Sequence, residues 1–349
     1  MRVVFSYFST LTVCVIWLMS SALAEGMPFR SAAANGYSLT VENLAVIIND
    51  DDARSVEVGA YYTKVRRVPA KNIIHIRLPN NTEKIDLANF NKMKQQIDGQ
   101  LHDDIQVILM IWTTPYAVEC NSITAAITLG FDAEQCKNTC APGKLSTYFD
   151  SGSKRPFTDM KYRISMLLPT DSVEQAKALI DRGLKSDYSA PTASAYFLLT
   201  SDGNRSSRAI HFPPSGNIPQ RYLTIKTLKA DSIEGEQDIM FYETGLVSVP
   251  KLDTLKFLPG ALADHLTSGG GVLRGKGQMS SVKWLEAGAT ASYGTVSEPC
   301  NYWQKFPNSS VLLKHYLIGA SAVEAYWKSV AWPAQGVFIG EPLASPYRR

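Results

Sequence analysis

Residues 44–78 of this 349-residue chain read LAVIINDDDARSVEVGAYYTKVRRVPAKNIIHIRL, and this stretch decides the class of fold. It opens on a continuous apolar run at 44–48 that polar residues close, which is typical of a strand buried on both faces. Apolar residues then recur at helical spacing through 55–65, and Pro69 ends that pattern. A second apolar run follows at 73–78. A strand, a helix and a strand in this order predict the beginning of a parallel sheet.

The same alternation continues along the chain and predicts one α/β domain built on a doubly wound, mostly parallel sheet with helices on both faces. Further strands are predicted at 105–112, 164–168, 195–200, 238–242, 290–296 and 336–339, and helices at 87–101, 172–184, 258–266 and 311–330. We expect a single domain over 39–349, with a subdivision near 205–219 as the alternative, because serine, proline and glycine are frequent there.

The first residues predict a secretory signal peptide. Arg2 precedes an apolar stretch that ends at Leu18, and the small-residue site Ala22-Leu23-Ala24 follows. We expect cleavage after Ala24, which removes residues 1–24, and a flexible leader at 25–38. An uncleaved anchor is the alternative, although the stretch is shorter than the roughly 20 residues that span a bilayer. After cleavage we expect no membrane span, and a location in the periplasm or outside the cell.

Composition excludes some classes of partner and cofactor. The formal net charge is only +3, and the basic residues are scattered among acids, so a nucleic-acid partner is not expected. Neither a Walker motif nor a Gly-x-Gly-x-x-Gly fingerprint is present, which argues against a nucleotide. The histidines form no metal-ligand spacing such as His-Glu-x-x-His. We predict no cofactor.

Four cysteines remain after Cys14 leaves with the signal peptide, and an exported protein favours their pairing. Four cysteines allow three connectivities, and spacing does not choose among them. We expect Cys120, Cys136 and Cys140 to supply one bridge among themselves, because they lie close together in a loop-rich stretch. A zinc site formed by these three residues and Cys300 is the less favoured alternative.

Ligands of open parallel sheets bind at the carboxyl ends of the strands, and four segments are predicted to lie there, at 49–52, 112–121, 242–245 and 297–302. Asp50, Asp51 and Asp52 follow the first strand, and their carboxylates are suitable ligands for Mg²⁺ or Ca²⁺. The favoured interpretation is that they cap the next helix and complement its dipole. Residues 113–159 form a long excursion over the strand ends, a kind of segment that often carries binding residues.

A cysteine-based catalytic site is the second candidate. His265 precedes a glycine-rich loop, Cys300 follows a predicted strand, and Glu298 is available to orient a base. This pair would make a nucleophile and a general base if the two side chains met. A disulfide at Cys300 would exclude that role, and a histidine beside such a loop is more often structural.

Long stretches of the chain resemble an uncharacterised bacterial family of exported proteins. These stretches are the one quoted above and, further along, ECNSITAAITLGFD, FLPGALADHLTSGGG, WLEAGATASYGTVSEPCNYWQKFPN and EAYWKSVAWPAQGVFIGEPLASP. More distantly, residues 238–342 resemble the second half of gingipain-type cysteine peptidases. That resemblance implies a caspase-like architecture.

The same resemblance argues against peptidase activity. Gingipain-type enzymes place His-Gly after one strand and the nucleophilic cysteine after the next. Here the first strand runs into Tyr242-Glu243-Thr244-Gly245, and residues 257–264 contain no cysteine. We therefore expect a non-catalytic binding protein that recognises a protein or an envelope component through the cysteine-bearing excursion. A secreted cysteine hydrolase that uses a rearranged site at His265 and Cys300 is the alternative.

Overall fold

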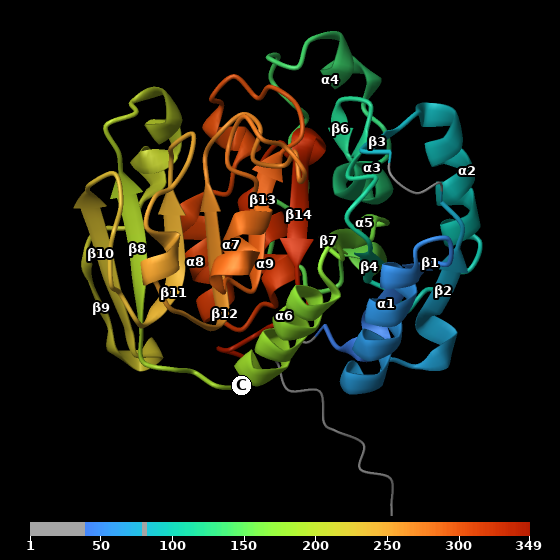
Figure 1. The fold of residues 1–349 in the computed structure, drawn as a ribbon, viewed down its shortest axis with the longest axis horizontal. Helices are drawn as coiled ribbons and strands as arrows, with labels where there is room; N and C mark the ends of the chain where they lie inside the picture. Colours follow the sequence, from blue (N-terminus) through green and yellow to red (C-terminus); the bar gives the residue numbers. More distant parts are fainter. Residues whose placement is uncertain (1–38, 79–81) are drawn as a thin grey trace, which may run out of the picture. The chain divides into compact units, whose positions relative to one another are not determined.

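The computed structural model describes residues 39–78 and 82–349, which belong to one compact unit (Figure 1). The predicted signal peptide and leader lie outside the described residues. Among the helices of the described part, none has the length and apolarity that crossing a membrane requires.

Strands and α-helices largely alternate up to residue 186, as the sequence predicts, whereas the strands between residues 193 and 265 follow one another without an α-helix. The strands of the main sheet are β1 (Leu44–Asn49), β2 (Ile73–Ile76), β4 (Val107–Ile111), β7 (Ile164–Leu168), β8 (Ala193–Leu199), β9 (Gly216–Ile218), β10 (Leu223–Lys229), β11 (Ile239–Thr244), β12 (Phe257–His265), β13 (Ala291–Thr295) and β14 (Gly336–Gly340). A small sheet contains β3 (Lys84–Ile85), β5 (Ala117–Val118) and β6 (Asn121–Ser122). The helices are α1 (Ala53–Arg66), α2 (Leu87–Asp98), α3 (Ile123–Leu129), α4 (Ala133–Lys137), α5 (Pro156–Met160), α6 (Val173–Ser186), α7 (Val282–Ala287), α8 (Ser309–Leu317) and α9 (Ala322–Ser329).

The main sheet has eleven strands in the order β2-β1-β4-β7-β14-β13-β12-β11-β8-β10-β9. Most neighbours are parallel, and antiparallel pairing occurs where β14 lies beside β13 and where β9 lies beside β10. The doubly wound, mostly parallel α/β class is thereby confirmed, and it is consistent with a caspase-like architecture. The sheet also continues across the 205–219 segment, because β8 before it pairs with β10 after it.

Helices cover both faces of the sheet (Figure 1). In that view α6 and α7 lie in front of the strands and α8 and α9 lie behind them. On the rear layer Trp327 of α9 is fully buried and stacks on Phe338 of β14, with ring centroids 4.3 Å apart. Its indole N–H donates to the carbonyl of Ser165 in β7 at 2.8 Å. This one residue therefore joins α9 to two neighbouring strands.

One predicted helix is a strand, and the helix predicted at 311–330 is divided into α8 and α9. The sequence pattern predicts a helix at 258–266, but the segment is strand β12. Its last six residues are buried, and a strand buried on both faces shows the continuous apolar run that a buried helix also shows. Gly260, at a φ of 89°, has a backbone conformation that an α-helix does not contain.

Candidate functional site

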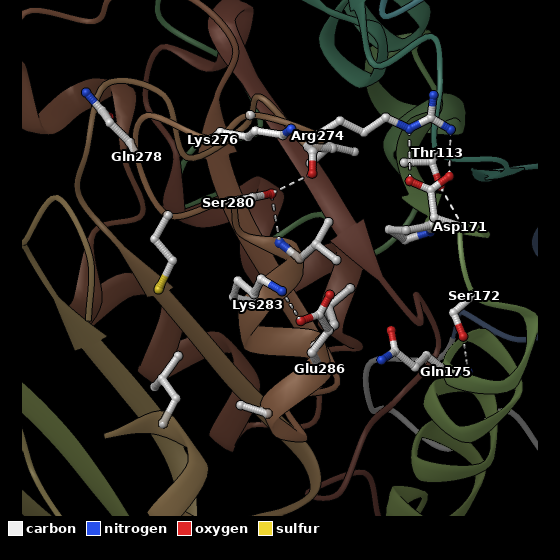
Figure 2. A pocket seen from close by; sticks show the side chains of 18 of the residues that line it. Thr113, Asp171, Ser172, Gln175, Arg274, Lys276, Gln278, Ser280, Lys283 and Glu286 are labelled. Atoms are coloured by element: carbon white, nitrogen blue, oxygen red, sulfur yellow. Dashed lines mark hydrogen bonds and ion pairs between the residues drawn. The ribbon is translucent and has the colours of Figure 1, made fainter. Parts of the chain in front are cut away.

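A cleft of about 1180 Å³ lies at the carboxyl ends of the strands, between the start of α6, helix α7 and the loops that follow β11 and β12 (Figure 2). The loop after β11 contributes Ser248, Val249, Leu252 and Asp253, and the loop after β12 contributes residues 273–280. Of the cysteine-bearing excursion at 113–159, Thr113 alone is among the cleft-lining residues. The cleft lies at the edge of the sheet where ligands of parallel sheets bind, and loops other than the excursion form most of its lining.

The floor of the cleft is apolar. Leu179 of α6 and Leu285 of α7 line it from the two helices, and Val249 and Leu273 line it from the loops. All four side chains are buried against the rest of the protein. Apolar floors with a few polar groups at the edge are the usual composition of ligand-binding clefts.

The polar edge of the cleft is organised by an ion pair between Asp171 and Arg274. The Arg274 guanidinium donates through Nε to one carboxylate oxygen at 2.9 Å and through Nη2 to the other at 2.6 Å (Figure 2). Burial alone would raise the pKa of Asp171, but hydrogen bonds and charge from Arg274 hold that pKa below its usual value. The pair joins the end of β7 to the loop after β12, so it fixes one wall of the cleft.

The hydroxyl of Thr113 positions Asp171 from behind. Its Oγ1 accepts hydrogen bonds from the backbone N–H of Thr170 at 2.8 Å and of Asp171 at 3.1 Å. Ser172 then caps helix α6 by accepting from the N–H of Gln175. Ser172 is therefore the residue that caps α6, while the neighbouring Asp171 binds Arg274.

The triple glycine at 269–271 has a packing role in the wall of the cleft. The backbone of Gly270 and Gly271 passes directly over Gly294 of β13, where a β-carbon would lie 2.3 Å from the Gly270 carbonyl carbon. The Gly271 N–H donates to the carbonyl of Thr295 at 2.9 Å. Glycine is needed there because the two backbones approach more closely than a side chain allows.

Substituting Gly294 tests that packing. We expect Gly294→Ala to lower the free energy of unfolding by about 1–3 kcal/mol, because the new methyl group must displace backbone atoms. Gly277→Ala is the matched control, since a β-carbon at Gly277 meets no atom within 4 Å. Urea unfolding of both variants measures the difference, and equal midpoints would show that the close approach is not rigid.

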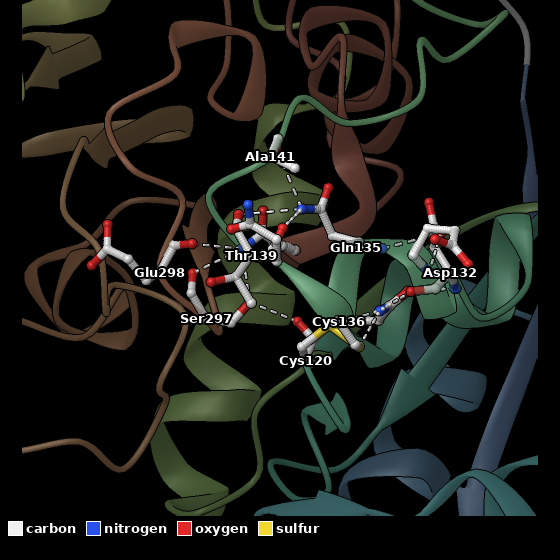
Figure 3. Close-up of a disulfide and its surroundings, with 12 residues drawn as sticks. Cys120, Asp132, Gln135, Cys136, Thr139, Ala141, Ser297 and Glu298 are labelled. Carbon is white, nitrogen blue, oxygen red and sulfur yellow. Dashed lines mark hydrogen bonds between the residues drawn. A yellow bond between two sulfur atoms is a disulfide. The ribbon is translucent and has the colours of Figure 1, made fainter.

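The four cysteines form two bridges, Cys120–Cys136 and Cys140–Cys300, with Cα atoms 5.4 Å and 5.1 Å apart. The expected bridge among the three clustered cysteines is confirmed (Figure 3). The second bridge attaches the excursion to the segment after β13. Ser297 supports the same attachment, because its hydroxyl donates to the carbonyl of Cys120 at 2.7 Å.

Polar side chains also hold the excursion in place. The Gln135 amide donates to the carbonyls of Asn138 and Thr139, both at 3.2 Å (Figure 3). The Lys305 ammonium, on a fully buried side chain, donates to the Thr139 carbonyl at 2.6 Å. Burial lowers the pKa of Lys305 to about 8. The excursion is therefore a fixed part of the fold.

The predicted pair of His265 and Cys300 does not form a nucleophile and a base. Cys300 is bonded to Cys140, and its backbone N–H donates to Glu298 at 2.8 Å. His265 ends β12 and is fully buried, where its Nδ1 accepts from the indole of Trp284 at 2.9 Å. Burial lowers the pKa of His265 to about 3. A cysteine in a disulfide carries no thiolate, which is the species that attacks a substrate.

The acidic turn at Asp50 to Asp52 is occupied by protein partners. Asp52 caps α1 by accepting from the N–H of Arg54, which is the favoured interpretation of the turn. Asp50 lies 2.7 Å from the Nδ1 of His75, and Asp51 lies 2.7 Å from the Nη1 of Arg77. Within residues 39–78 and 82–349, no group of three or more histidine, cysteine, aspartate or glutamate side chains is arranged to hold a metal ion.

Comparisons with known proteins add little to this picture. No protein-family model matches the chain, and no curated protein matches it. A solved structure described as "Structure of Protease" is similar at a TM-score of 0.44 and 10% sequence identity. The match covers 90% of this chain and 80% of that one. At this level the similarity does not bear on activity.

Sequence reasoning missed the residues that organise the cleft. Neither Asp171 nor Arg274 is among the site residues predicted from the sequence. The two residues lie 103 positions apart, and only the crossing of the chain between the two halves of the sheet brings them together. Asp171 follows the predicted strand at 164–168 closely, whereas Arg274 follows a glycine-rich loop and a segment predicted to be helical, so the sequence did not place it at a strand end.

Proposed function

We propose that this protein is a non-catalytic binding protein of the periplasm or cell exterior, and that the cleft beside α6 and α7 binds a peptide segment. The observation that carries the proposal is the cleft itself, with its apolar floor and its paired charges at the strand edge. At about 1180 Å³ it exceeds the roughly 300–1,000 Å³ of most small-molecule sites, which favours an extended ligand.

The charges in the cleft favour a peptide over a strongly charged ligand. Three basic and three acidic side chains line it, namely Arg274, Lys276, Lys283, Asp171, Asp253 and Glu286. Two of the basic residues already have acidic partners, because Arg274 binds Asp171 and Lys283 lies 2.5 Å from Glu286. A balanced lining of this kind does not attract polyphosphates or nucleic acid.

Backbone groups in the cleft supply a second argument for a peptide. Within the described part of the chain, the N–H groups of Lys276, Gly277 and Gln278 donate to no protein acceptor. Main-chain donors beside an apolar floor suit an extended peptide, since backbone hydrogen bonds give it affinity and side-chain pockets give it specificity. The glycine at 277 keeps this part of the loop open to an approaching backbone.

The state of the cysteines supports both the location and the lack of catalysis. Two bridges are typical of a protein that matures in an oxidising compartment. They also leave Cys300 without a thiol, while the pKa of His265 is too low for a base at neutral pH. The positions at which gingipain-type enzymes carry His-Gly and the nucleophile remain unmatched in this chain.

Selection of ligands from a phage-displayed peptide library tests the proposal. We expect enriched peptides to bind the purified protein, and Val282→Arg to weaken their binding at least tenfold by placing a charge on the half-buried cleft wall. Val56→Arg is the matched control, because Val56 lies on α1 outside the cleft and is 40% exposed. Urea midpoints show whether both variants remain folded.

The same experiment has two outcomes that would overturn the proposal. If no peptide is enriched, or if both variants bind with the affinity of the unmodified protein, the cleft is not a peptide site. If the peptides are cleaved and Cys300→Ala abolishes cleavage, the protein is a cysteine peptidase and the non-catalytic assignment is wrong.

A further inference from the structure

Three ionisable side chains are completely enclosed at the base of the two loops that line the cleft. Arg208 belongs to a 3₁₀ helix at Asn204–His211, Glu243 lies near the end of β11, and Asp264 lies near the end of β12. No more than 1% of any of these residues is exposed. Charged residues are rarely buried to this extent unless they are paired.

Arg208 binds the ends of both strands with one guanidinium group. Its Nη1 lies 2.5 Å from Oδ1 of Asp264 and 3.5 Å from Oε2 of Glu243. Its Nη2 donates to two backbone carbonyls, that of Thr244 at 2.9 Å and that of Asp264 at 3.2 Å. The two cleft loops begin immediately after these residues, so Arg208 fixes the positions from which both loops start.

The charges of this cluster do not balance. Two carboxylates face one guanidinium, and Asp264 makes the close contact with it. Oε2 of Glu243 contacts the hydroxyl of Ser309, while Oε1 has no hydrogen-bond partner within the described residues. An ionised Glu243 would therefore be a buried charge without full compensation, which is costly. Burial raises the pKa of Glu243 to about 8 and also raises the pKa of Asp264.

The histidine and tyrosine side chains around the cluster do not gain or lose a proton near neutral pH. Burial lowers the pKa of His265 in β12 to about 3, so the imidazole is neutral. Burial raises the pKa of Tyr326 in α9 and of Tyr293 in β13 well above the usual value. Arg205, on the same 3₁₀ helix as Arg208, pairs with Asp202 at 2.7 Å. The proton that is gained or lost therefore belongs to the two carboxyl groups of the cluster, and Glu243 is the one that lacks a close contact with the guanidinium.

We propose that Arg208, Glu243 and Asp264 form a proton-dependent clamp on the two cleft loops, closed while Glu243 holds a proton and loosened when that proton is lost. The proposal extends beyond peptide binding, because it concerns the loops themselves and holds whatever the ligand is. Its consequence is that the cleft is best organised in acidic medium and becomes looser as the pH rises toward about 8.

The direction of the effect follows from proton linkage. A carboxyl group whose pKa is raised in the clamped state favours that state fully below its ordinary pKa of 4.5. The preference is lost as pH rises through the interval up to about 8. Over that interval the equilibrium for loosening should rise about tenfold for each pH unit, and above it the equilibrium should level off.

Hydrogen exchange followed by mass spectrometry between pH 5 and pH 9 tests the clamp without any ligand. After correction for the intrinsic pH dependence of exchange, we expect opening of residues 245–256 and 266–281 to rise toward pH 8 and then level off. Strands β1 and β4, which lie in the other half of the sheet, serve as the internal reference. Glu243→Gln keeps the shape of the side chain and cannot ionise, so its loops should show no such rise.

Glu174→Gln is the matched control, because it makes the same change at an exposed residue on α6 and should follow the unmodified protein. Opening that is independent of pH in the unmodified protein would overturn the proposal, and this result does not depend on whether the Glu243 variant folds. An undiminished rise in Glu243→Gln would overturn it as well, because the responsible proton would then belong to another group.

Discussion

Replacing Glu341 with alanine is expected to destabilise the protein by about 3–5 kcal/mol, because the buried guanidinium of Arg66 loses its main partner. Glu341 follows β14 and is fully buried, and it lies 2.8 Å from the Nη2 of Arg66, whose side chain is only 5% exposed. It also accepts from Arg66 Nε at 3.1 Å and from the Tyr62 hydroxyl at 2.9 Å. The pair thereby joins α1 to the end of the central strand.

Urea unfolding measures this effect against a matched ion pair on the surface. Lys177 and Glu57 join α6 to α1 at 2.6 Å, but 57% of the Glu57 side chain is exposed. Glu57→Ala should therefore cost less than about 1 kcal/mol. Arg66 also binds Asp187 at 2.5 Å, so if Glu341→Ala were no more harmful than Glu57→Ala, Asp187 alone would be a sufficient partner for the buried guanidinium.

Removing the Cys140–Cys300 bridge is expected to cost about 5 kcal/mol, and removing the Cys120–Cys136 bridge about 3 kcal/mol, on the chain-entropy estimate of disulfide stabilisation. The Cys140–Cys300 bridge spans a sequence separation of 160 residues and the Cys120–Cys136 bridge spans 16, so the Cys140–Cys300 bridge restricts the unfolded chain more. Each pair is replaced by serines together, so that no unpaired thiol remains. Urea unfolding of the two double variants compares the costs.

The order of the two costs is the informative result. If the double variant at Cys120 and Cys136 were the less stable one, the loss of local contacts in the excursion would cost more free energy than the loss of the longer loop closure in the unfolded chain. Those contacts include the bonds that Gln135 and Lys305 make to the carbonyl of Thr139. Equal stability of the unmodified protein and both variants would show that the bridges do not stabilise the fold.

Most of the sheet was predictable from the sequence because its strands are continuous apolar runs closed by polar turns. The run at 44–48 became β1, and the run at 164–168 became β7. Strand β10 was missed, although the alternation LTIKTLK at Leu223–Lys229 is the signal of a strand with one exposed face. Strand β12 was taken for a helix because an apolar run buried on both faces lacks any period that separates the two structures.

The candidate site was less predictable, because it depends on contacts between distant residues. Sequence pattern placed Asp171 at the start of a helix, but nothing local indicates that Arg274 lies against it. The buried cluster has the same character, since Arg208 lies in a segment that reads as a polar loop and its partners lie in two strands. Pairing of Cys140 with Cys300 likewise follows from strand order, which spacing alone does not fix.

One cross-linking experiment tests both whether a peptide binds in the cleft and whether it remains uncleaved. A library-selected peptide carrying a photoreactive benzophenone is bound to the purified protein and irradiated, and mass spectrometry then locates the cross-link. The account predicts cross-links within residues 248–253 and 273–283 and recovery of the unbound peptide at its intact mass. Cross-links confined to other surfaces, or a peptide recovered in fragments, would contradict it.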